Sequence, residues 1–389
     1  MIFNLVNRKH SIVWTGVVST LLGRTAFANV APVPTGPYVT GVHDFEFVDT
    51  TYPSSSPTGR RLMGRVWYPA CLQFEFQPDT NTCIHDNAEI PFSRKRALFE
   101  PGEFEATALH IPTIMSPFMD LTALFEEARD GTSNSFIDAP PLGASGTSKS
   151  LTTRQAVTNN LPLVVFSHGG ASTVGSSTFQ MEELASHGYV VVSVAHPGWA
   201  AGIMYPNGDT IDIDENFVMA MFMDADPSDG VNDPDITNRY NARKARAERT
   251  DTGLAAFVPR GRDDLMAMVD YLEQETSSTS ESLVLRSLGI SSGQRSVVYM
   301  GHSYGGCLAA SAAQVDPRAI GVINLDGTHQ YKDLLGTQLR VPMVTLVTET
   351  LMENYAYYTN EFNYEPLASM GRYDSRMTVL KITLQSTTI

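Results

Sequence analysis

Ser303 lies in a short motif whose residue types can supply a nucleophile. Residues 301–305 read Gly-His-Ser-Tyr-Gly, with an apolar, β-branched run before them at 297–300 and a run of small residues after them at 307–313. This pattern predicts a strand, a tight turn and a helix, in which G-x-S-x-G holds a serine on a strained turn at the end of the strand. The two glycines fit because a side chain at either position would collide across the turn. The N-terminus of the following helix would stabilise negative charge that develops at the serine.

Two backbone N–H groups are expected to bind an oxyanion beside Ser303. One belongs to Tyr304, directly after the serine. The other should come from the loop after the first buried strand, 161–166, where the sequence reads Ser-His-Gly-Gly over 167–170. We assign it to Gly170, because a glycine lets a substrate approach the backbone closely. An ordinary turn is the alternative for the His-Gly-Gly run.

A serine nucleophile also needs a histidine base and an acid that orients the base. Asp326 follows the apolar run 319–325 and is the first candidate for the acid, with an Asx turn or a helix cap as its alternative. Glu349, one predicted strand later, is the second candidate. His329 is the last histidine of the sequence, and it lies too close to Asp326 for a good reach to the serine. No histidine follows the last predicted strand, 378–384, where chain order would place the base.

The elements that must position these residues alternate between strand and helix. Short continuous apolar runs, at 161–166, 189–195, 319–325, 341–347 and 378–384, suit parallel strands that are buried on both faces. Helical spacing at 179–187 and 262–275 and an N-terminal hairpin at 42–48 and 61–68 complete the predicted elements. The candidate residues follow strands, and an open α/β sheet builds its site at the carboxyl ends of its strands.

Three segments are assigned no place in the predicted sheet. Residues 71–100 and 131–160 are expected to form surface loops. Residues 200–258 form an insertion with an apolar patch at 217–223. A lid that covers an acyl site or touches lipid is one interpretation of this patch, and ordinary core packing is the favoured one.

Length and composition limit the classes of function. The chain has 389 residues, 42% of them hydrophobic, which is enough for one large α/β domain with additions. Its formal net charge of −15 argues against nucleic acid as a partner. No uninterrupted apolar stretch of about 18 residues occurs, so no transmembrane segment is predicted.

Residues 1–28 have the features of an export signal. Arg8 and Lys9 form a basic start, residues 11–22 form a short apolar core, and Ala-Phe-Ala at 26–28 is a cleavage site. We therefore predict a secreted protein, with a buried N-terminal helix or strand as the alternative.

The three cysteines are expected to divide into a pair and a single thiol. Cys71 and Cys83 lie 12 residues apart in a polar loop and are expected to form a disulfide in an exported protein. Cys307, in the predicted helix after the serine, is expected to be a buried free thiol. Neither C-x-x-C nor H-E-x-x-H spacing occurs, so we predict no metal site and no cofactor.

Four motifs in this order resemble the platelet-activating-factor acetylhydrolase family of α/β-hydrolases, in its plasma or exported type. They lie at 165–170, 184–191, 301–306 and 324–327. The resemblance implies an α/β-hydrolase fold, a mostly parallel sheet with helices on both faces, in one domain over 29–389. It also implies metal-independent hydrolysis of short or oxidised acyl groups, typically from glycerophospholipids.

The same resemblance implies roles for individual residues. Ser303 is expected to be the nucleophile, Asp326 the acid in preference to Glu349, and Gly170 and Tyr304 the oxyanion donors. The family places its catalytic histidine a few residues after the last strand, and residues 385–389 contain none. The leading hypothesis is thus a serine esterase that acts on a small-molecule or lipid ester, of the 1-alkyl-2-acetylglycerophosphocholine type, with possible peripheral contact to lipid. The alternatives are a truncated or degenerate hydrolase fold that at most binds a ligand, and a polyester- or cutin-type carboxylesterase.

Overall fold

A computed structural model describes most of the chain between residues 32 and 348, together with one further strand. The described residues are 32–52, 59–85, 88–109, 111, 128–142, 161–224, 238, 241–242, 244–245, 248–249, 252–275, 283–288, 296–327, 334, 339–348 and 377–382. The predicted export signal, His329, Glu349 and the last seven residues lie outside them.

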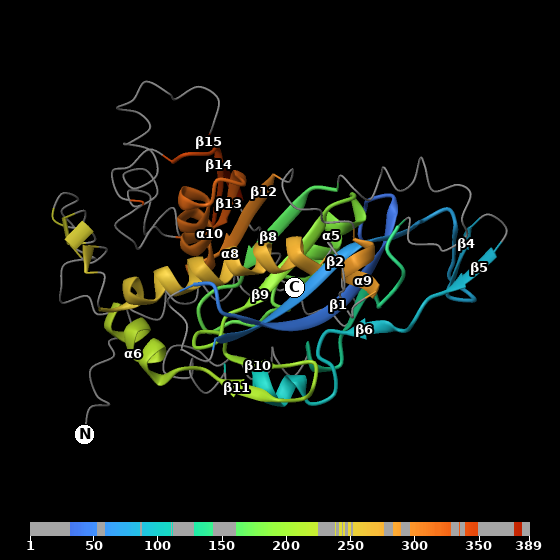
Figure 1. Cartoon of the computed structure of the whole chain (residues 1–389), viewed down its shortest axis with the longest axis horizontal. Helices are drawn as coiled ribbons and strands as arrows, with labels where there is room; N and C mark the ends of the chain where they lie inside the picture. Colours follow the sequence, from blue (N-terminus) through green and yellow to red (C-terminus); the bar gives the residue numbers. More distant parts are fainter. Residues whose placement is uncertain are drawn as a thin grey trace, which may run out of the picture.

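A ten-stranded sheet in the order β15-β14-β13-β12-β8-β9-β2-β1-β7-β6 forms the centre of the fold (Figure 1). Its first strands, β1 (Tyr38–Asp49) and β2 (Arg60–Leu72), pair as the predicted antiparallel hairpin. Six strands that are parallel to one another follow: β8 (Leu163–Ser167), β9 (Val190–Ala195), β12 (Val297–His302), β13 (Ala319–Leu325), β14 (Met343–Thr348) and β15 (Met377–Ile382). Apart from shifts of a few residues at their ends, these are the strands that the apolar runs predicted.

The central strands are buried on both faces, which explains why their sequences are continuously apolar. On β8, Leu163 and Val165 belong to the cluster formed with α8 (Val258–Glu275) and α10 (Tyr304–Val315). The alternate residues Val164 and Phe166 pack with Met181 of α5 (Thr178–Ser186). Figure 1 shows α8 lying along the sheet. The predicted fold, a mostly parallel sheet with helices on both faces, is therefore confirmed.

Two segments predicted to be loops contain strands. Residues 71–100 hold a three-stranded antiparallel sheet of β3 (Phe76–Gln77), β4 (Thr82–His85) and β5 (Ala88–Pro91), followed by β6 (Lys95–Ala97) at the sheet edge. Residues 131–160 begin with β7 (Thr132–Ile137). These strands are short or polar and lack an apolar pattern, so only their pairing partners reveal them.

The polar sequence of β7 is explained by a buried carboxylate on α5. Glu182 is 0% exposed and accepts hydrogen bonds from the backbone N–H groups of Asn134 and Ser135, at 2.7 and 2.9 Å, and from the Ser135 hydroxyl at 2.8 Å. Buried polar groups need such partners. A strand of Ser, Thr and Asn residues can therefore be buried here although its composition is typical of loops.

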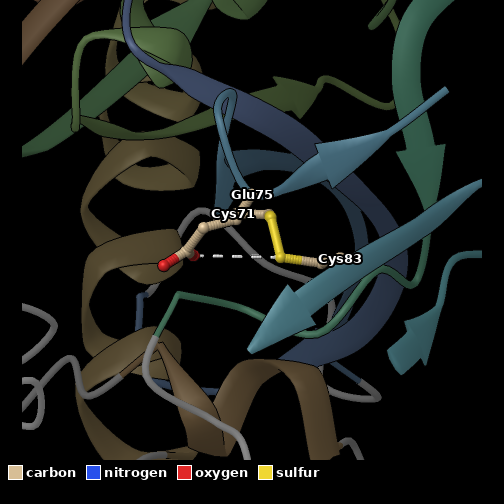
Figure 2. Close-up of side chains that lie close together, drawn as sticks. All are labelled: Cys71, Glu75 and Cys83. Carbon is tan, nitrogen blue, oxygen red and sulfur yellow. Dashed lines mark hydrogen bonds between the residues drawn. A yellow bond between two sulfur atoms is a disulfide. The ribbon is translucent and has the colours of Figure 1, made fainter. Parts of the chain in front are cut away.

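The predicted disulfide between Cys71 and Cys83 is confirmed, and it joins β2 to β4. Figure 2 shows the two sulfur atoms bonded and the Glu75 carboxylate beside them, with one oxygen 4.0 Å from the Cys83 sulfur. Because each sulfur is bonded to the other, neither is a thiolate that could bind a cation. The bond attaches the three-stranded sheet to the large one. Cys307 is buried and forms no disulfide, as predicted.

The insertion at 200–258 packs much of its apolar patch into the core. It forms β10 (Gly202–Met204), β11 (Thr210–Asp212), α6 (Glu215–Asp224) and the 3₁₀ helix η3 (Leu254–Phe257). Phe217 is 0% exposed and Met221 9%, whereas Met219 is 58% exposed. For the described part of the patch, core packing is thus the correct interpretation for most residues. No described helix is both long enough and apolar enough to cross a membrane.

A cluster of four charges, three of them buried and Asp44 partly exposed, holds the edge of the sheet to the hairpin. Arg65 on β2, 1% exposed, donates to Asp44 of β1 at 2.6 and 3.0 Å and to Glu103 at 2.8 Å. Arg96 on β6 donates to the same two carboxylates at 3.1 and 2.7 Å. Burial alone would raise the pKa of Glu103, but the two guanidinium charges outweigh it and lower the pKa. Glu103 immediately precedes the π-helix η1 (Phe104–Ala108), so the cluster attaches η1 and β6 to the hairpin.

Replacement of Arg65 by methionine is expected to destabilise the fold strongly. Without Arg65, the carboxylates of Asp44 and Glu103 would share the single positive charge of Arg96, and breaking a buried ion cluster costs about 3–5 kcal/mol in the free energy of unfolding. Arg94→Met is the matched control, since Arg94 pairs with Glu100 at the surface, where such pairs contribute about 1 kcal/mol or less. Urea denaturation of both variants measures the difference, and equal losses would contradict the assignment.

Candidate active site

Ser303 occupies the strained turn between β12 and α10 that the sequence predicted. Its backbone has φ 53° and ψ −122°, a conformation that residues other than glycine rarely adopt. A Cβ at Gly301 would lie 2.0 Å from the carbonyl oxygen of Gly305, and one at Gly305 would lie 2.2 Å from that of Ser167. Both positions therefore accept only glycine. Strain of this kind is typical of functional sites.

Asp326 follows the end of β13 as Ser303 follows the end of the neighbouring strand β12. His302 pairs with Leu325, so the next residues on β12 and β13, Ser303 and Asp326, leave the sheet side by side. The Ser303 N–H donates to the Leu325 carbonyl at 2.8 Å. Asp326 also has a positive φ, 57°, and is 9% exposed. A nucleophile and an acid from these two strand ends would face the same edge of the sheet.

The side chain of Asn324 closes the turn that carries Asp326. Asn324 is 0% exposed, accepts the N–H of Gly327 at 2.8 Å and donates to its carbonyl at 3.1 Å. A Cβ at Gly327 would lie 2.4 Å from the Asn324 side-chain oxygen and 2.6 Å from the Ser303 carbonyl oxygen. The Asn-Leu-Asp-Gly motif thus forms a tight turn against the serine turn.

The predicted oxyanion loop lies against the serine turn. A Cβ at Gly169 would be 3.4 Å from that of Ser303, and one at Gly170 would be 3.7 Å from that of Tyr304. Within the described part of the chain, the Gly170 N–H donates to no backbone acceptor. Tyr304 is the first residue of α10, where N–H groups point out of the helix end. The structure therefore places Gly170 and Tyr304 next to each other, beside Ser303.

Three buried histidines lie at this end of the sheet. Burial and the neighbouring His196 lower the pKa of His168 to about 3, and burial lowers the pKa of His302 to about 4. Burial also lowers the pKa of His196, although Asp264 opposes this shift. All three are therefore neutral at pH 7. Among the described residues, none of them is hydrogen-bonded to the Ser303 hydroxyl, and His329 lies outside the described residues.

A second group of polar side chains, which the sequence analysis missed, lies behind the oxyanion loop. Ser167 Oγ is 2.9 Å from His196 Nε2, and His196 Nδ1 is 3.0 Å from Asp264 Oδ2. Arg60 donates to both oxygens of Asp264, at 2.6 and 3.0 Å. One feature of the sequence pointed to this group. Asp264 lies four residues before Met268 and therefore on the apolar face of α8, where both side chains are buried. An acid on such a face must be paired.

The sheet and the strained Gly-x-Ser-x-Gly turn after β12 are those of an α/β-hydrolase. A family model described as platelet-activating factor acetylhydrolase, isoform II, matches residues 147–354, more than half of the chain. The chain belongs to this family and is thereby a member of a class of serine ester hydrolases. The resemblance drawn from the four motifs is confirmed.

One solved structure supports the fold. A ferulic acid esterase from Streptomyces cinnamoneus has a TM-score of 0.50 and 19% identity, covering 91% of this chain and 75% of that one. An acylaminoacyl peptidase from Pyrococcus horikoshii has a TM-score of 0.32 and 15% identity, covering 58% of this chain and 32% of that one. No curated protein sequence matches the chain.

Gly305→Ala is expected to disrupt the turn, because its Cβ would lie 2.2 and 2.5 Å from the carbonyl oxygens of Ser167 and His168, much closer than van der Waals contact allows. Overpacking of this kind costs about 1–3 kcal/mol, and more where only backbone can move. Gly321→Ala on β13 is the matched control, since the one atom near its Cβ is 3.7 Å away. Thermal unfolding compares the two variants. A Gly305→Ala protein as stable as Gly321→Ala would show that the turn is looser than described.

Proposed function

We propose that the chain hydrolyses short acyl esters with Ser303 as the nucleophile, in the manner of a platelet-activating-factor acetylhydrolase. The observation that carries the proposal is the close approach of the Gly169–Gly170 backbone to a strained Ser303. Preorganised N–H donors beside a nucleophile stabilise the charge that develops in acyl transfer. Family membership supports the reaction class, and the 2-acetylglycerophosphocholine substrate belongs to the proposal.

In the proposed reaction, the Ser303 oxygen bonds to the acyl carbon and loses its proton to a histidine. The N–H groups of Gly170 and Tyr304 bind the oxyanion. The bond to the alcohol then breaks, and the alcohol leaves with the proton from the histidine. Water attacks the acyl-enzyme in the same way and releases the acid. Asp326 orients the histidine, and His329, which lies outside the described residues, is the histidine to be tested for this role.

An aromatic wall beside Gly170 supports a preference for short acyl groups. A Cβ at Gly170 would lie 3.0 Å from the ring of Phe217, so this ring packs directly on the predicted oxyanion donor. Phe217 is held by Phe257, Tyr304 and Trp199, with ring centroids 5.2, 5.5 and 6.2 Å away. A bulky buried ring at this place limits the space for an acyl chain.

Export and lipid contact form part of the same proposal. A disulfide persists in oxidising compartments, so the Cys71–Cys83 bond supports a secreted protein. Met219, exposed on α6, belongs to the element that carries Phe217 and could contact lipid near the site.

Ser303→Ala is expected to abolish hydrolysis of p-nitrophenyl acetate. Loss of the nucleophile removes covalent catalysis, so kcat/KM should fall by more than about a thousandfold. Spectrophotometric assay of both proteins, with His329→Ala beside them, measures the effect. If wild type is no faster than Ser303→Ala, the chain hydrolyses no such ester and the degenerate-fold alternative is favoured. Full activity of His329→Ala would exclude that histidine as the base.

Phe217→Leu is expected to shift the acyl-chain preference toward longer esters. Space for additional methylenes in an apolar pocket changes kcat/KM by about tenfold or more, so the ratio for p-nitrophenyl hexanoate over acetate should rise. Phe136→Leu is the control, because Phe136 is 2% exposed but belongs to β7, at the far side of the sheet. An unchanged ratio in Phe217→Leu would place the acyl chain elsewhere. A preference for polymeric or aromatic esters over acetate would favour the polyester- or cutin-type alternative.

A further inference from the structure

Ser167, His196 and Asp264 form a hydrogen-bonded chain that the proposed reaction does not use. Their contacts, hydroxyl to Nε2 at 2.9 Å and Nδ1 to carboxylate at 3.0 Å, have the order of a serine–histidine–acid triad. Their exposed fractions are 0, 0 and 2%. A substrate cannot reach a hydroxyl so completely buried, and a second hydrolytic centre is therefore excluded.

The protonation of the three groups allows one arrangement of hydrogen bonds. Burial would raise the pKa of Asp264, but the Arg60 charge and the hydrogen bond from His196 outweigh it, so the carboxyl is ionised. His196 is neutral because burial lowers its pKa. An ionised carboxylate only accepts hydrogen bonds, so Nδ1 of His196 carries the proton. Nε2 is then an acceptor, and the Ser167 hydroxyl must donate to it.

The hydrogen-bonded residues Asp264, His196 and Ser167 connect α8 to the ends of two neighbouring strands. Ser167 is the last residue of β8, and His196 directly follows β9. Arg60, which is bound to Asp264, also donates to the Pro197 carbonyl at 2.6 Å. His196 stacks on Trp199, with ring centroids 4.9 Å apart. The loop after β9 is therefore held from one end by an ionised pair on the α8 face.

That loop in turn holds the predicted oxyanion loop. The Trp199 carbonyl accepts the N–H of Ala171 at 2.8 Å, and Ala171 has a positive φ of 53°. The backbone N–H of His196 donates to Nε2 of His168 at 3.4 Å. Gly170 is thus enclosed between two residues that are both bonded to the loop after β9. Ser167 also contributes the carbonyl that a Cβ at Gly305 would strike.

We propose that the Asp264–His196–Ser167 chain is a positioning relay, which fixes residues 168–171 against the serine turn and so sets the geometry of the oxyanion donors. The three residues act through the loop and touch no substrate. The expected effect on kcat rests on the proposed esterase function, whereas the expected effect on the conformation of residues 168–171 does not.

The kinetic test compares Ser167→Ala, Asp264→Asn, the double variant and Ser193→Ala on p-nitrophenyl acetate. Ser193 is the matched control: it is 0% exposed on β9, and its hydroxyl has no hydrogen-bond partner among the described residues. A misplaced oxyanion donor should lower kcat by about tenfold to a hundredfold, with KM changed by less than about twofold. Because both ends act through His196, the double variant should be no worse than the poorer single variant. Unchanged kcat, additive losses or an equal loss in Ser193→Ala would overturn the proposal.

A second measurement does not depend on esterase activity. ¹⁵N-labelled histidine spectra of the wild type should show His196 with its proton on Nδ1, and amide exchange should show Ala171 protected. Ser167→Ala and Asp264→Asn should accelerate exchange at Ala171, and Ser193→Ala should not. If no variant alters this exchange, or if His196 carries its proton on Nε2, the relay is refuted. If wild type shows no hydrolysis above Ser303→Ala while these spectra are as expected, the proposed function fails and the relay stands.

Discussion

The backbone at the serine turn approaches its neighbours so closely that no Cβ can be accommodated at four positions. The glycines at 301, 305, 306 and 327 would each place a Cβ within 2.4 Å of a backbone or Asn324 side-chain atom. This contact brings the end of β8, the turn after β12 and the turn after β13 together. The remainder of the site depends on it, because the oxyanion loop, Ser303 and Asp326 each come from one of these three strand ends.

Such close contact requires the surrounding loops to be fixed, and buried polar groups fix them. Asn324 holds the turn that carries Asp326. The hydrogen bonds that link Asp264, His196 and Ser167 hold the predicted oxyanion loop from the α8 side. Buried, fully paired polar groups of this kind specify one arrangement, since any alternative would leave a polar atom unpaired in the core. Arg65 also fixes its surroundings, because its ion pairs with Asp44 and Glu103 attach the edge of the sheet to its centre.

The insertion and the hydrolase sheet form one core. Phe217 of α6 packs on Trp199, which follows β9, and on Tyr304, which begins α10. Phe257 of η3 packs on Trp199 and on Phe217. An element inserted between β9 and β12 thereby forms a wall next to the predicted oxyanion donor Gly170. In the proposed reaction, the acyl-chain preference would therefore depend on how the insertion packs on the sheet.

Much of the fold and the centre of the site could be predicted from the sequence alone. The buried strands were visible because strands covered on both faces are continuously apolar, and the serine turn because only glycine fits its contacts. The small sheet at 76–91 and the strand β7 were missed, since edge strands take their structure from pairing and not from a local pattern. The Asp264–His196–Ser167 chain was missed for a related reason: its members are 29 and 68 residues apart, and only the packing of α8 on the ends of β8 and β9 brings them within hydrogen-bond distance.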